Sequence, residues 1–257
     1  MAEPQVLVVA GLDPSGGAGL LADVRVCAAH GVRPVAVATA LTEQTTEALF
    51  AVNPVAPEIV GAQLRALVAD VEVAAVKLGM LGSSAIAERV GRTLASVPAP
   101  VVWDPVGRAT RGVGVFTDDE LRAVARQLGA AITVMTPNAA EAAALAGATI
   151  GTLDEAVAAG RAIAERYGTV AVLVKGGHWG VDAIDVLATA GACWTFAGPR
   201  LPIAVPVHGT GCALSTALAC ELARGATVLE AVRRAKAYVA ARIAAPVLPG
   251  HGRPAVL

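Results

Sequence analysis

Apolar residues along the chain gather in short runs that are rich in β-branched side chains. These runs are mostly apolar and do not alternate with polar residues, which is typical of strands buried on both faces of a parallel sheet. They predict parallel strands at residues 6–11, 35–41, 74–79, 101–106, 132–138 and 170–177.

Longer stretches between these runs repeat their apolar residues every three or four positions, which is the spacing of a helix with one buried face. They predict helices at residues 19–30, 57–70, 83–95, 117–128, 154–167, 212–224 and 229–244. Strands that alternate with helices indicate an α/β protein whose central, mainly parallel sheet is covered on both faces.

The pattern changes in the last third of the chain. The segments "DAIDVLAT" and "ACWTFAGP" are separated only by Ala190 and Gly191, which predicts an antiparallel hairpin added to the edge of the sheet. No repeat, low-complexity tract or polar linker divides the sequence. We therefore expect residues 1–257 to form one domain.

The composition argues against several classes of protein. The chain has 257 residues, 55% of them hydrophobic, so it can bury a large core. A net charge of −1 without a basic stripe argues against a nucleic-acid partner. The start "MAEPQVLVVAG" is unlike a signal peptide, and no apolar stretch reaches the roughly 20 residues of a membrane span, so we expect a cytoplasmic protein without a membrane partner. The four cysteines form no CxxC pair, which argues against zinc or a disulfide framework.

Polar and glycine-rich segments follow the predicted strands. These segments are "GLDPSGGAGLLAD", "TEQTT", "GMLGSS", "DPVGRATRG", "TPNAAE" and "KGGHWG", and "HGTGC" precedes a predicted helix. Ligands of open parallel sheets bind outside the carboxyl ends of the strands, so the segments predict a ligand site at that edge. "GLDPSGGAG" is not a GxGxxG fingerprint and no acidic residue ends the second strand, which argues against a dinucleotide.

Several residues at this edge have both a structural and a functional interpretation. Asn138 and Glu141 stand three apart at a helix start, where they could cap the helix or serve a phosphate oxygen and the waters of Mg²⁺. Lys175 precedes two glycines and is either a solvated charge or a phosphate contact. Asp104 ends an apolar strand, where a buried carboxylate needs a metal, cation or amide partner.

The "HGTGC" segment combines glycines with the start of a helix. Its glycines allow the amides of Gly209, Thr210, Gly211 and Cys212 to point the same way, and the helix adds the positive end of its dipole. These features predict a pocket for anionic oxygens. We expect the pocket to lower the pKa of the Cys212 thiol, which would then exist partly as thiolate. In the alternative interpretation Cys212 is a small apolar filler, as expected for the other helical cysteines.

Six motifs of the chain resemble, in sequence and order, those of the hydroxymethylpyrimidine/phosphomethylpyrimidine kinases. They are "GLDPSGGAGLLAD", "ALTEQTT", "VKLGML", "TPNAAEAAAL", "VKGGH" and "HGTGCALSTALACELARG". The resemblance to this ribokinase-like family covers nearly the whole chain. It implies a three-layer αβα fold around a mainly parallel sheet of about eight strands, and a homodimer. It also implies ATP- and Mg²⁺-dependent phosphorylation of the hydroxymethyl group of a small pyrimidine, and often of its monophosphate, in thiamin biosynthesis or salvage.

The resemblance also assigns roles to residues. It implies that the pyrimidine lies against Gly11, Asp23, Gln44, Met80 and Val106, with Cys212 closing the site. Gln44 would pair with the ring amine and nitrogen, because an amide offers a donor and an acceptor together. The metal, the phosphates and the nucleotide would be served by Asp104, Asn138, Glu141, Lys175 and Lys236. The amides of residues 209–212 would stabilise the transferring phosphoryl group, and a Cys212 thiolate would accept or relay the proton.

Two positions depart from the family pattern. After "DPV" the family continues with a methionine and a lysine-containing stretch, whereas this chain reads "GRATRGVGVF". Arg108 or Arg111 could replace that lysine, although arginine is larger and forked, and the second phosphorylation depends on this replacement. Pro206 stands where the family has threonine.

Two other functions remain open. One is a pyridoxal or pyridoxine kinase on the same scaffold, in which a thiol could add to the aldehyde of the ring. The other is a pyrimidine-binding protein without catalysis, whose loop after Val106 has changed. Gln44 and Met80 favour a pyrimidine over pyridoxal, and the phosphate-directed residues, such as Lys175, argue against a mere binding protein.

Overall fold

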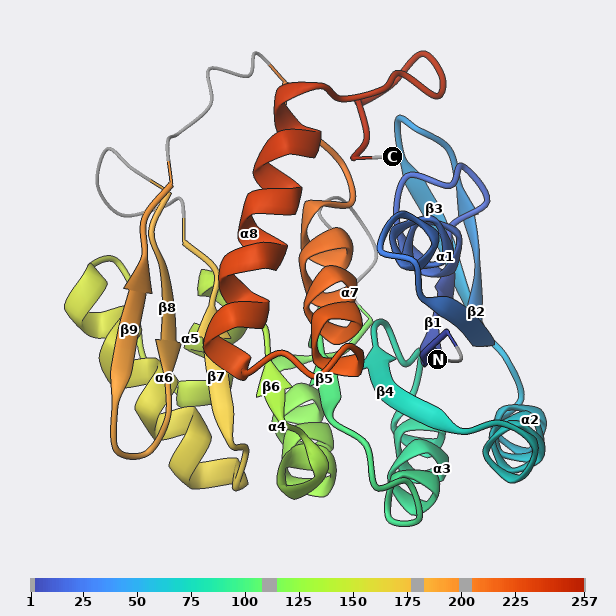
Figure 1. Ribbon diagram of the computed structural model, residues 1–257, viewed down its shortest axis with the longest axis horizontal. Helices are drawn as coiled ribbons and strands as arrows, with labels where there is room; N and C mark the ends of the chain where they lie inside the picture. Colours follow the sequence, from blue (N-terminus) through green and yellow to red (C-terminus); the bar gives the residue numbers. More distant parts are fainter. Residues whose placement is uncertain (1–2, 108–114, 177–182, 199–204, 257) are drawn as a thin grey trace.

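The computed structural model describes residues 3–107, 115–176, 183–198 and 205–256. Its centre is one sheet of nine strands in the order β3-β2-β1-β4-β5-β6-β7-β8-β9 (Figure 1). The strands are β1 (Gln5–Leu12), β2 (Arg33–Gln44), β3 (Leu49–Pro54), β4 (Val73–Leu78), β5 (Val101–Trp103), β6 (Val134–Met135), β7 (Ala171–Val174), β8 (Asp185–Ala188) and β9 (Cys193–Phe196).

The middle of the sheet is parallel and both of its edges are antiparallel. Strands β2, β1, β4, β5, β6 and β7 pair in parallel, as their largely apolar sequences predict. The predicted hairpin is confirmed, because β8 pairs antiparallel with β7 and β9 with β8. The sequence prediction missed β3, which pairs antiparallel with β2 at the opposite edge. That edge strand carries exposed residues such as Phe50, so it lacks the continuous apolar run of a buried strand.

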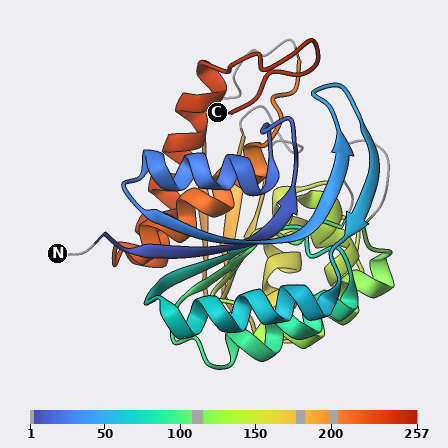
Figure 2. The same ribbon diagram turned by 90° about the vertical axis from the view of Figure 1, so that its right-hand side faces the viewer.

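Helices cover both faces of this sheet. They are α1 (Gly19–Ala29), α2 (Pro57–Asp70), α3 (Ser84–Leu94), α4 (Asp118–Leu128), η1 (Gly129–Ala131), α5 (Ala139–Ala146), α6 (Leu153–Tyr167), α7 (Thr210–Ala223) and α8 (Val228–Ala244). Helices α1, α7 and α8 pack on one face and α2 to α6 on the other, which gives the expected three layers (Figures 1 and 2). In the described part of the chain, no helix combines the length and the apolar content needed to cross a bilayer.

Strand β1 shows how the sequence builds the two halves of the core. Val6, Val8 and Ala10 point to the face covered by α1, α7 and α8, whereas Leu7 and Val9 point to the opposite face. All of these side chains are buried. Successive residues of a strand face opposite sides, so a strand covered on both faces is apolar at most positions.

The strand order places a ligand site at the carboxyl end of β1. Strands β2 and β4 lie on opposite sides of β1, so the chain changes direction across the sheet at this strand. Such a reversal leaves a crevice outside the carboxyl ends of the strands, which is where open α/β sheets bind ligands. The loop from β1 to α1 and the N-terminus of α7 both lie at this edge.

Candidate active site

A cavity of about 1960 Å³ runs along the carboxyl edge of the sheet. Pockets for a single small ligand are typically about 300–1000 Å³, so this cavity has room for two substrates side by side. All of the predicted site residues except Asp23 line it. These lining residues are Gly11, Gln44, Met80, Asp104, Val106, Asn138, Glu141, Lys175, Gly209, Thr210, Gly211, Cys212 and Lys236.

Asp23 lies beneath the cavity, which corrects its expected role as a direct substrate contact. Its carboxylate is fully buried and lies 2.5 Å from the Nζ of Lys77, a residue of β4. Thr216, on α7, donates a hydrogen bond of 2.7 Å to the other carboxylate oxygen. Asp23 sits in the second turn of α1, which packs against β1 and α7, so its side chain points into the protein.

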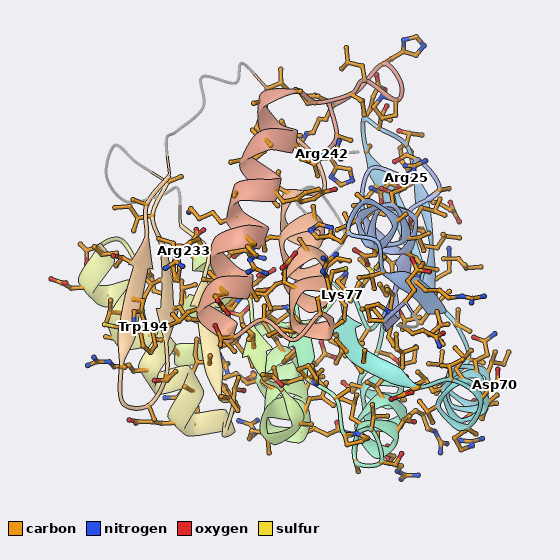
Figure 3. All side chains as sticks on the ribbon, in the orientation of Figure 1. Arg25, Asp70, Lys77, Trp194, Arg233 and Arg242 are labelled. Atoms are coloured by element: carbon orange, nitrogen blue, oxygen red, sulfur yellow. The ribbon has the colours of Figure 1, made fainter. Side chains whose placement is uncertain are left out.

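The Lys77–Asp23 pair joins three elements under the site. Lys77 is itself fully buried and lies in the middle of the molecule beside α7 (Figure 3). Burial alone would lower the pKa of Lys77, but the neighbouring Asp23 carboxylate raises it above its usual value and keeps the ammonium charged. The sequence showed Lys77 only as part of an apolar strand, so this partnership was not predicted.

Lys175 and Asp104 form the charged centre of the cavity. Lys175 follows β7 and Asp104 follows β5, and the Nζ of Lys175 lies 2.6 Å from Oδ1 of Asp104. Gly211 approaches this pair so closely that a Cβ atom there would lie 3.2 Å from Nζ and 3.4 Å from Asp104 Oδ2. Asp104 thus has the cation partner that its burial requires.

The N-terminus of α7 has the geometry of an anion site. Its N-cap, Gly209, has a φ of +80° and no side chain to cap the helix. A Cβ atom at Gly209 would lie 2.0 Å from the carbonyl oxygen of Gly17, so the close approach of the two loops requires glycine here. Other helices of the described chain, such as α4 and α8, begin with a threonine whose side chain caps the first turn. The amides of the first turn of α7 therefore remain available to an anionic ligand.

The thiol of Cys212 differs from the sequence expectation. Burial raises the pKa of Cys212 to about 11, although Lys77 and a hydrogen bond from the backbone of Gly19 act in the opposite direction. The carboxylates of Asp23 and Asp104 add to the increase. The predicted lowering of the pKa is therefore wrong, and Cys212 is a neutral thiol at pH 7. The helix dipole was a valid local argument, but the sequence did not reveal the burial of the thiol, which has the largest effect on its pKa.

Asn138 and Glu141 form the predicted reciprocal cap of α5. Asn138 Oδ1 accepts a hydrogen bond of 2.9 Å from the backbone of Glu141, and Glu141 Oε2 accepts one of 2.8 Å from the backbone of Asn138. Both residues still line the cavity. Burial raises the pKa of Glu141 to about 7, while the Lys175 ammonium opposes this effect.

The carboxylates at this edge suit Mg²⁺ in particular. Asp104 and Glu141 line the same cavity, and within the described ranges no three His, Cys, Asp or Glu side chains are arranged to hold a metal ion by themselves. Magnesium usually binds through one or two carboxylates, with water and phosphate oxygens completing its shell. These residues therefore fit a magnesium ion carried in with a nucleotide.

Lys236 marks the far end of the cavity, beside the hairpin of β8 and β9. Its Nζ lies 2.6 Å from Asp185 Oδ2 and donates a 2.9 Å hydrogen bond to the carbonyl oxygen of Ala183. The backbone of Gly176 donates to the other carboxylate oxygen of Asp185. This network ties α8 to the strands that line the nucleotide end implied by the resemblance.

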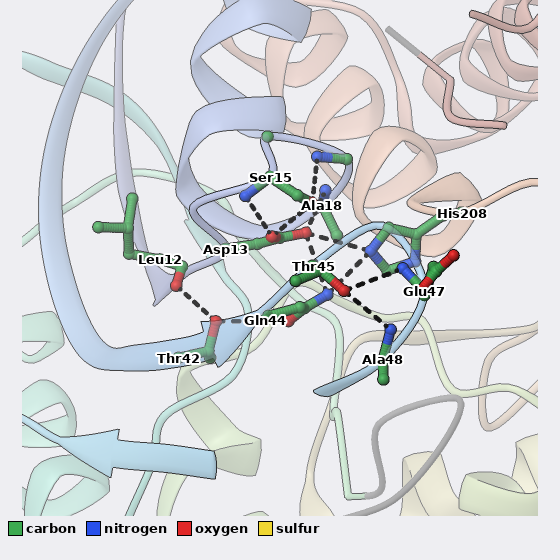
Figure 4. Close-up of polar contacts among 12 residues, drawn as sticks. Leu12, Asp13, Ser15, Ala18, Thr42, Gln44, Thr45, Glu47, Ala48 and His208 are labelled. Carbon is green, nitrogen blue, oxygen red and sulfur yellow. Dashed lines mark hydrogen bonds and ion pairs between the residues drawn. The ribbon is translucent and has the colours of Figure 1, made fainter. Parts of the chain in front are cut away.

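Gln44 belongs to a polar network at the opposite end of the cavity (Figure 4). Its Nε2 donates to Asp13 Oδ2 at 3.2 Å, and the Nε2 of His208 lies 3.1 Å from the same oxygen. Asp13 and His208 were not among the predicted site residues. Both belong to quoted motifs, "GLDPSGGAG" and "HGTGC", so the signal was present but their partnership is nonlocal.

The segment that departs from the family pattern is described only in part. Arg108 and Arg111, the candidate replacements for the family lysine, lie outside the described residues. Pro206 is described and lines the cavity just before His208.

Comparisons with known proteins agree with this geometry. The phosphomethylpyrimidine kinase family matches residues 13–256. The hydroxymethylpyrimidine/phosphomethylpyrimidine kinase of Streptomyces coelicolor is 40% identical over 252 residues, which cover 97% of this chain and 92% of that protein. A crystal structure of phosphomethylpyrimidine kinase from Clostridium difficile 630 is similar, with a TM-score of 0.81 at 30% identity. The match covers 94% of this chain and 100% of the other.

A pyridoxal kinase is also similar in structure. The enzyme from Staphylococcus aureus in complex with ADP has a TM-score of 0.91 at 27% identity, over 100% of this chain and 94% of that one. These neighbours confirm the expected ribokinase-like fold, with nine strands among the described residues in place of about eight. With a match over 244 of its positions (residues 13–256) and a 40% identical relative, the chain belongs to the phosphomethylpyrimidine kinase family.

Proposed function

We propose that this chain transfers the terminal phosphoryl group of ATP to 4-amino-5-hydroxymethyl-2-methylpyrimidine, and then to its monophosphate, in thiamin biosynthesis or salvage. The observation that carries the proposal is the layout of the cavity. A donor–acceptor amide, Gln44, lies at one end, the uncapped N-terminus of α7 lies with Lys175 at the centre, and Lys236 lies at the other end.

The pyrimidine end is shaped by small and apolar residues. A Cβ atom at Gly11 would lie 3.1 Å from the sulfur of Met80, so glycine leaves room for a flat ring beside this side chain. Gln44 presents amide groups to the same space. In the proposal these residues hold the ring, and its hydroxymethyl group faces Cys212.

Catalysis in this proposal depends on position and charge. Phosphoryl transfer through a loose transition state needs little help from a base, and most of the rate comes from alignment and stabilisation of the equatorial oxygens. The amides of Gly211 and Cys212 and the ammonium of Lys175 would supply that stabilisation. Because the pKa of Cys212 is about 11, Cys212 acts as a thiol that positions the alcohol and is not a thiolate base.

Magnesium is part of the proposal. Asp104 and Glu141 would hold the ion, directly or through water, when it arrives with the nucleotide. When bound, the ion would neutralise charge that develops on the phosphates. We further propose that residues 1–257 act as one kinase domain, that two chains form a homodimer, and that the protein works in the cytoplasm.

Pyridoxal phosphorylation is the second candidate, supported by the likeness to the S. aureus pyridoxal kinase. The raised pKa of Cys212 disfavours addition of its sulfur to the aldehyde of pyridoxal, because that addition requires the thiolate. Measuring ADP release with Mg-ATP and each alcohol in turn distinguishes the candidates. We expect kcat/KM for the aminopyrimidine alcohol to exceed that for pyridoxal by at least about tenfold. A higher value for pyridoxal would reverse the assignment, and no turnover with either would favour a binding protein.

A further inference from the structure

The polar network around Gln44 determines which way its amide points. Asp13 Oδ2 accepts hydrogen bonds from Gln44 Nε2 and from the backbone of Ala18, at 3.2 and 3.1 Å, and His208 Nε2 approaches it to 3.1 Å. Hydrogen bonds from His208 and Ser15 lower the pKa of Asp13 below its usual value although burial opposes them, so the carboxylate is ionised. An ionised carboxylate only accepts hydrogen bonds. The amide nitrogen of Gln44 must therefore face Asp13.

His208 reinforces this choice. Its Nε2 lies 3.2 Å from the Nε2 of Gln44, and both nitrogens approach the same oxygen of Asp13. With the proton of His208 on Nε2, both groups donate to that oxygen. A flipped amide would put Gln44 Oε1 against the carboxylate, where two acceptors repel each other.

The backbone of His208 is bound by the C-terminal segment of the chain. Its backbone N–H donates to the carbonyl oxygen of Pro254 at 2.8 Å, and its carbonyl accepts from Val256 at 3.2 Å. A Cβ atom at Gly17 would lie 2.7 Å from the imidazole ring, so glycine at that position allows the ring to reach Asp13. The C-terminal segment thus fixes the imidazole over Gln44.

The fixed amide leaves one donor and one acceptor for a ligand. One of the two Nε2 hydrogens goes to Asp13 and the second is left over. The hydroxyl of Thr42 lies 2.9 Å from the carbonyl oxygen of Leu12 and 3.3 Å from Gln44 Oε1. A hydroxyl has one proton and the oxygen of Leu12 is closer, so Oε1 keeps lone pairs for the cavity.

We propose that the Asp13–His208 pair is a positioning pair that fixes the Gln44 amide and thereby selects rings with an amine donor beside a nitrogen acceptor. This inference rests on the proposed function for the identity of the ring. A 4-aminopyrimidine presents such an adjacent donor and acceptor. Pyridoxal does not, because its phenol and ring nitrogen are separated by a methyl-bearing carbon.

A double-mutant cycle tests this coupling through binding, independently of turnover. The dissociation constants of the aminopyrimidine alcohol and of pyridoxal are measured by calorimetry for wild type, Asp13→Asn, Gln44→Ala and the double variant. An asparagine at position 13 can present oxygen or nitrogen, so it no longer dictates the orientation of Gln44. We expect Asp13→Asn to weaken pyrimidine binding about tenfold, to change pyridoxal binding less than about twofold, and to have no effect in the Gln44→Ala background.

Equal weakening of pyrimidine binding in both backgrounds, or equal weakening for both ligands, would overturn the inference. Ser15→Ala is the matched control, because Ser15 bonds the other oxygen of Asp13, Oδ1, at 2.7 Å. It should leave the preference for pyrimidine unchanged, and a shift as large as that of Asp13→Asn would contradict the role given to Oδ2. If Asp13→Asn does not fold, His208→Leu should lose the preference and His208→Gln, which retains a donor, should restore much of it.

The same experiment separates failure of this inference from failure of the proposed function. Strong coupling in binding, without ADP release by wild type, would overturn the kinase assignment and support the positioning pair. Turnover by wild type, together with additive effects of Asp13→Asn and Gln44→Ala on pyrimidine binding, would support the kinase assignment and overturn the role of the Asp13–His208 pair. Absence of pyrimidine binding by wild type would overturn both.

Discussion

Lys175 and Asp104 follow strands that are not neighbours in the sheet, yet the Nζ of Lys175 lies 2.6 Å from Oδ1 of Asp104. The strand between them, β6, ends at Met135, and the backbone then turns away to begin α5. The cation and the carboxylate therefore meet in the cavity opposite Gly211, where the proposal puts the transferring phosphoryl group.

Removal of the Lys175 ammonium should impair catalysis. Lys175→Gln removes a charge that would face the phosphates and leaves Asp104 without its cation. We expect kcat to fall by about 100-fold or more at saturating ATP, measured as ADP release. Arg161→Gln, which removes a cation from an exposed site on α6, is the control. A value of kcat for Lys175→Gln within about threefold of this control would contradict the assigned role.

Alkylation kinetics should report the raised pKa of Cys212. Only the thiolate reacts with iodoacetamide, so a pKa of about 11 predicts that the rate rises about tenfold per pH unit from pH 7 to pH 9. The measurement is best made in the Cys193→Ser variant. Cys193 and Cys212 are the two partly exposed cysteines, whereas Cys27 and Cys220 are fully buried. A rate that levels off by pH 8 would show that the thiol is acidic and that the sequence expectation was right.

The buried pair Lys77–Asp23 should matter chiefly for stability. Lys77→Met leaves the Asp23 carboxylate buried and unpaired, so we expect the free energy of unfolding to drop by about 3–5 kcal/mol in urea titrations. Arg92→Gln breaks the exposed pair with Glu88 on α3 and should cost less than about 1 kcal/mol. Equal losses in the two variants would refute the importance of the buried pair.

Glu141 should make stability depend on pH in the absence of nucleotide and metal. Its pKa is about 7 in the folded protein, above the ordinary value of 4.5, mainly because of burial. The folded state therefore holds the proton more tightly than the unfolded state, and the stabilisation is lost as pH rises from about 4.5 through 7. Glu141→Gln stays neutral and can still accept the hydrogen bond from Asn138, so its stability relative to wild type should increase by about 1–3 kcal/mol between pH 5 and pH 8. An equal difference in stability between Glu141→Gln and wild type at pH 5 and at pH 8 would contradict the raised pKa of Glu141.

The fold was largely predictable because its buried strands are apolar at most positions. The predicted helix at residues 57–70 matches α2 at both ends, and the hairpin of β8 and β9 was found from its turn. Strands β5 and β6 are shorter than predicted, because the chain leaves the ladder to bring Asp104 and Asn138 to the cavity. Strand β3 was not predicted because it is an exposed edge strand and lacks the apolar run of a buried strand.

The site was predictable where its signal is local. Glycines before a helix predicted the uncapped start of α7, and the spacing of Asn138 and Glu141 predicted their cap. The contacts that the sequence did not predict join residues far apart in the chain. The sequence predicts a ligand contact for Asp23 because nothing local indicates that Lys77, 54 positions away, is its partner. Asp13 and His208 are separated by 195 positions, so the sequence does not predict their contact either.

The central claim is that backbone N–H groups at the start of α7 bind the phosphoryl group in transfer. A crystal structure with Mg²⁺, a nonhydrolysable ATP analogue and the aminopyrimidine alcohol tests it most directly. We predict that oxygens of the terminal phosphate lie within hydrogen-bonding distance of the N–H groups of Gly211 and Cys212 and of Lys175 Nζ, with the alcohol facing them. A terminal phosphate bound elsewhere in the cavity, with these amides contacting only solvent, would contradict the claim.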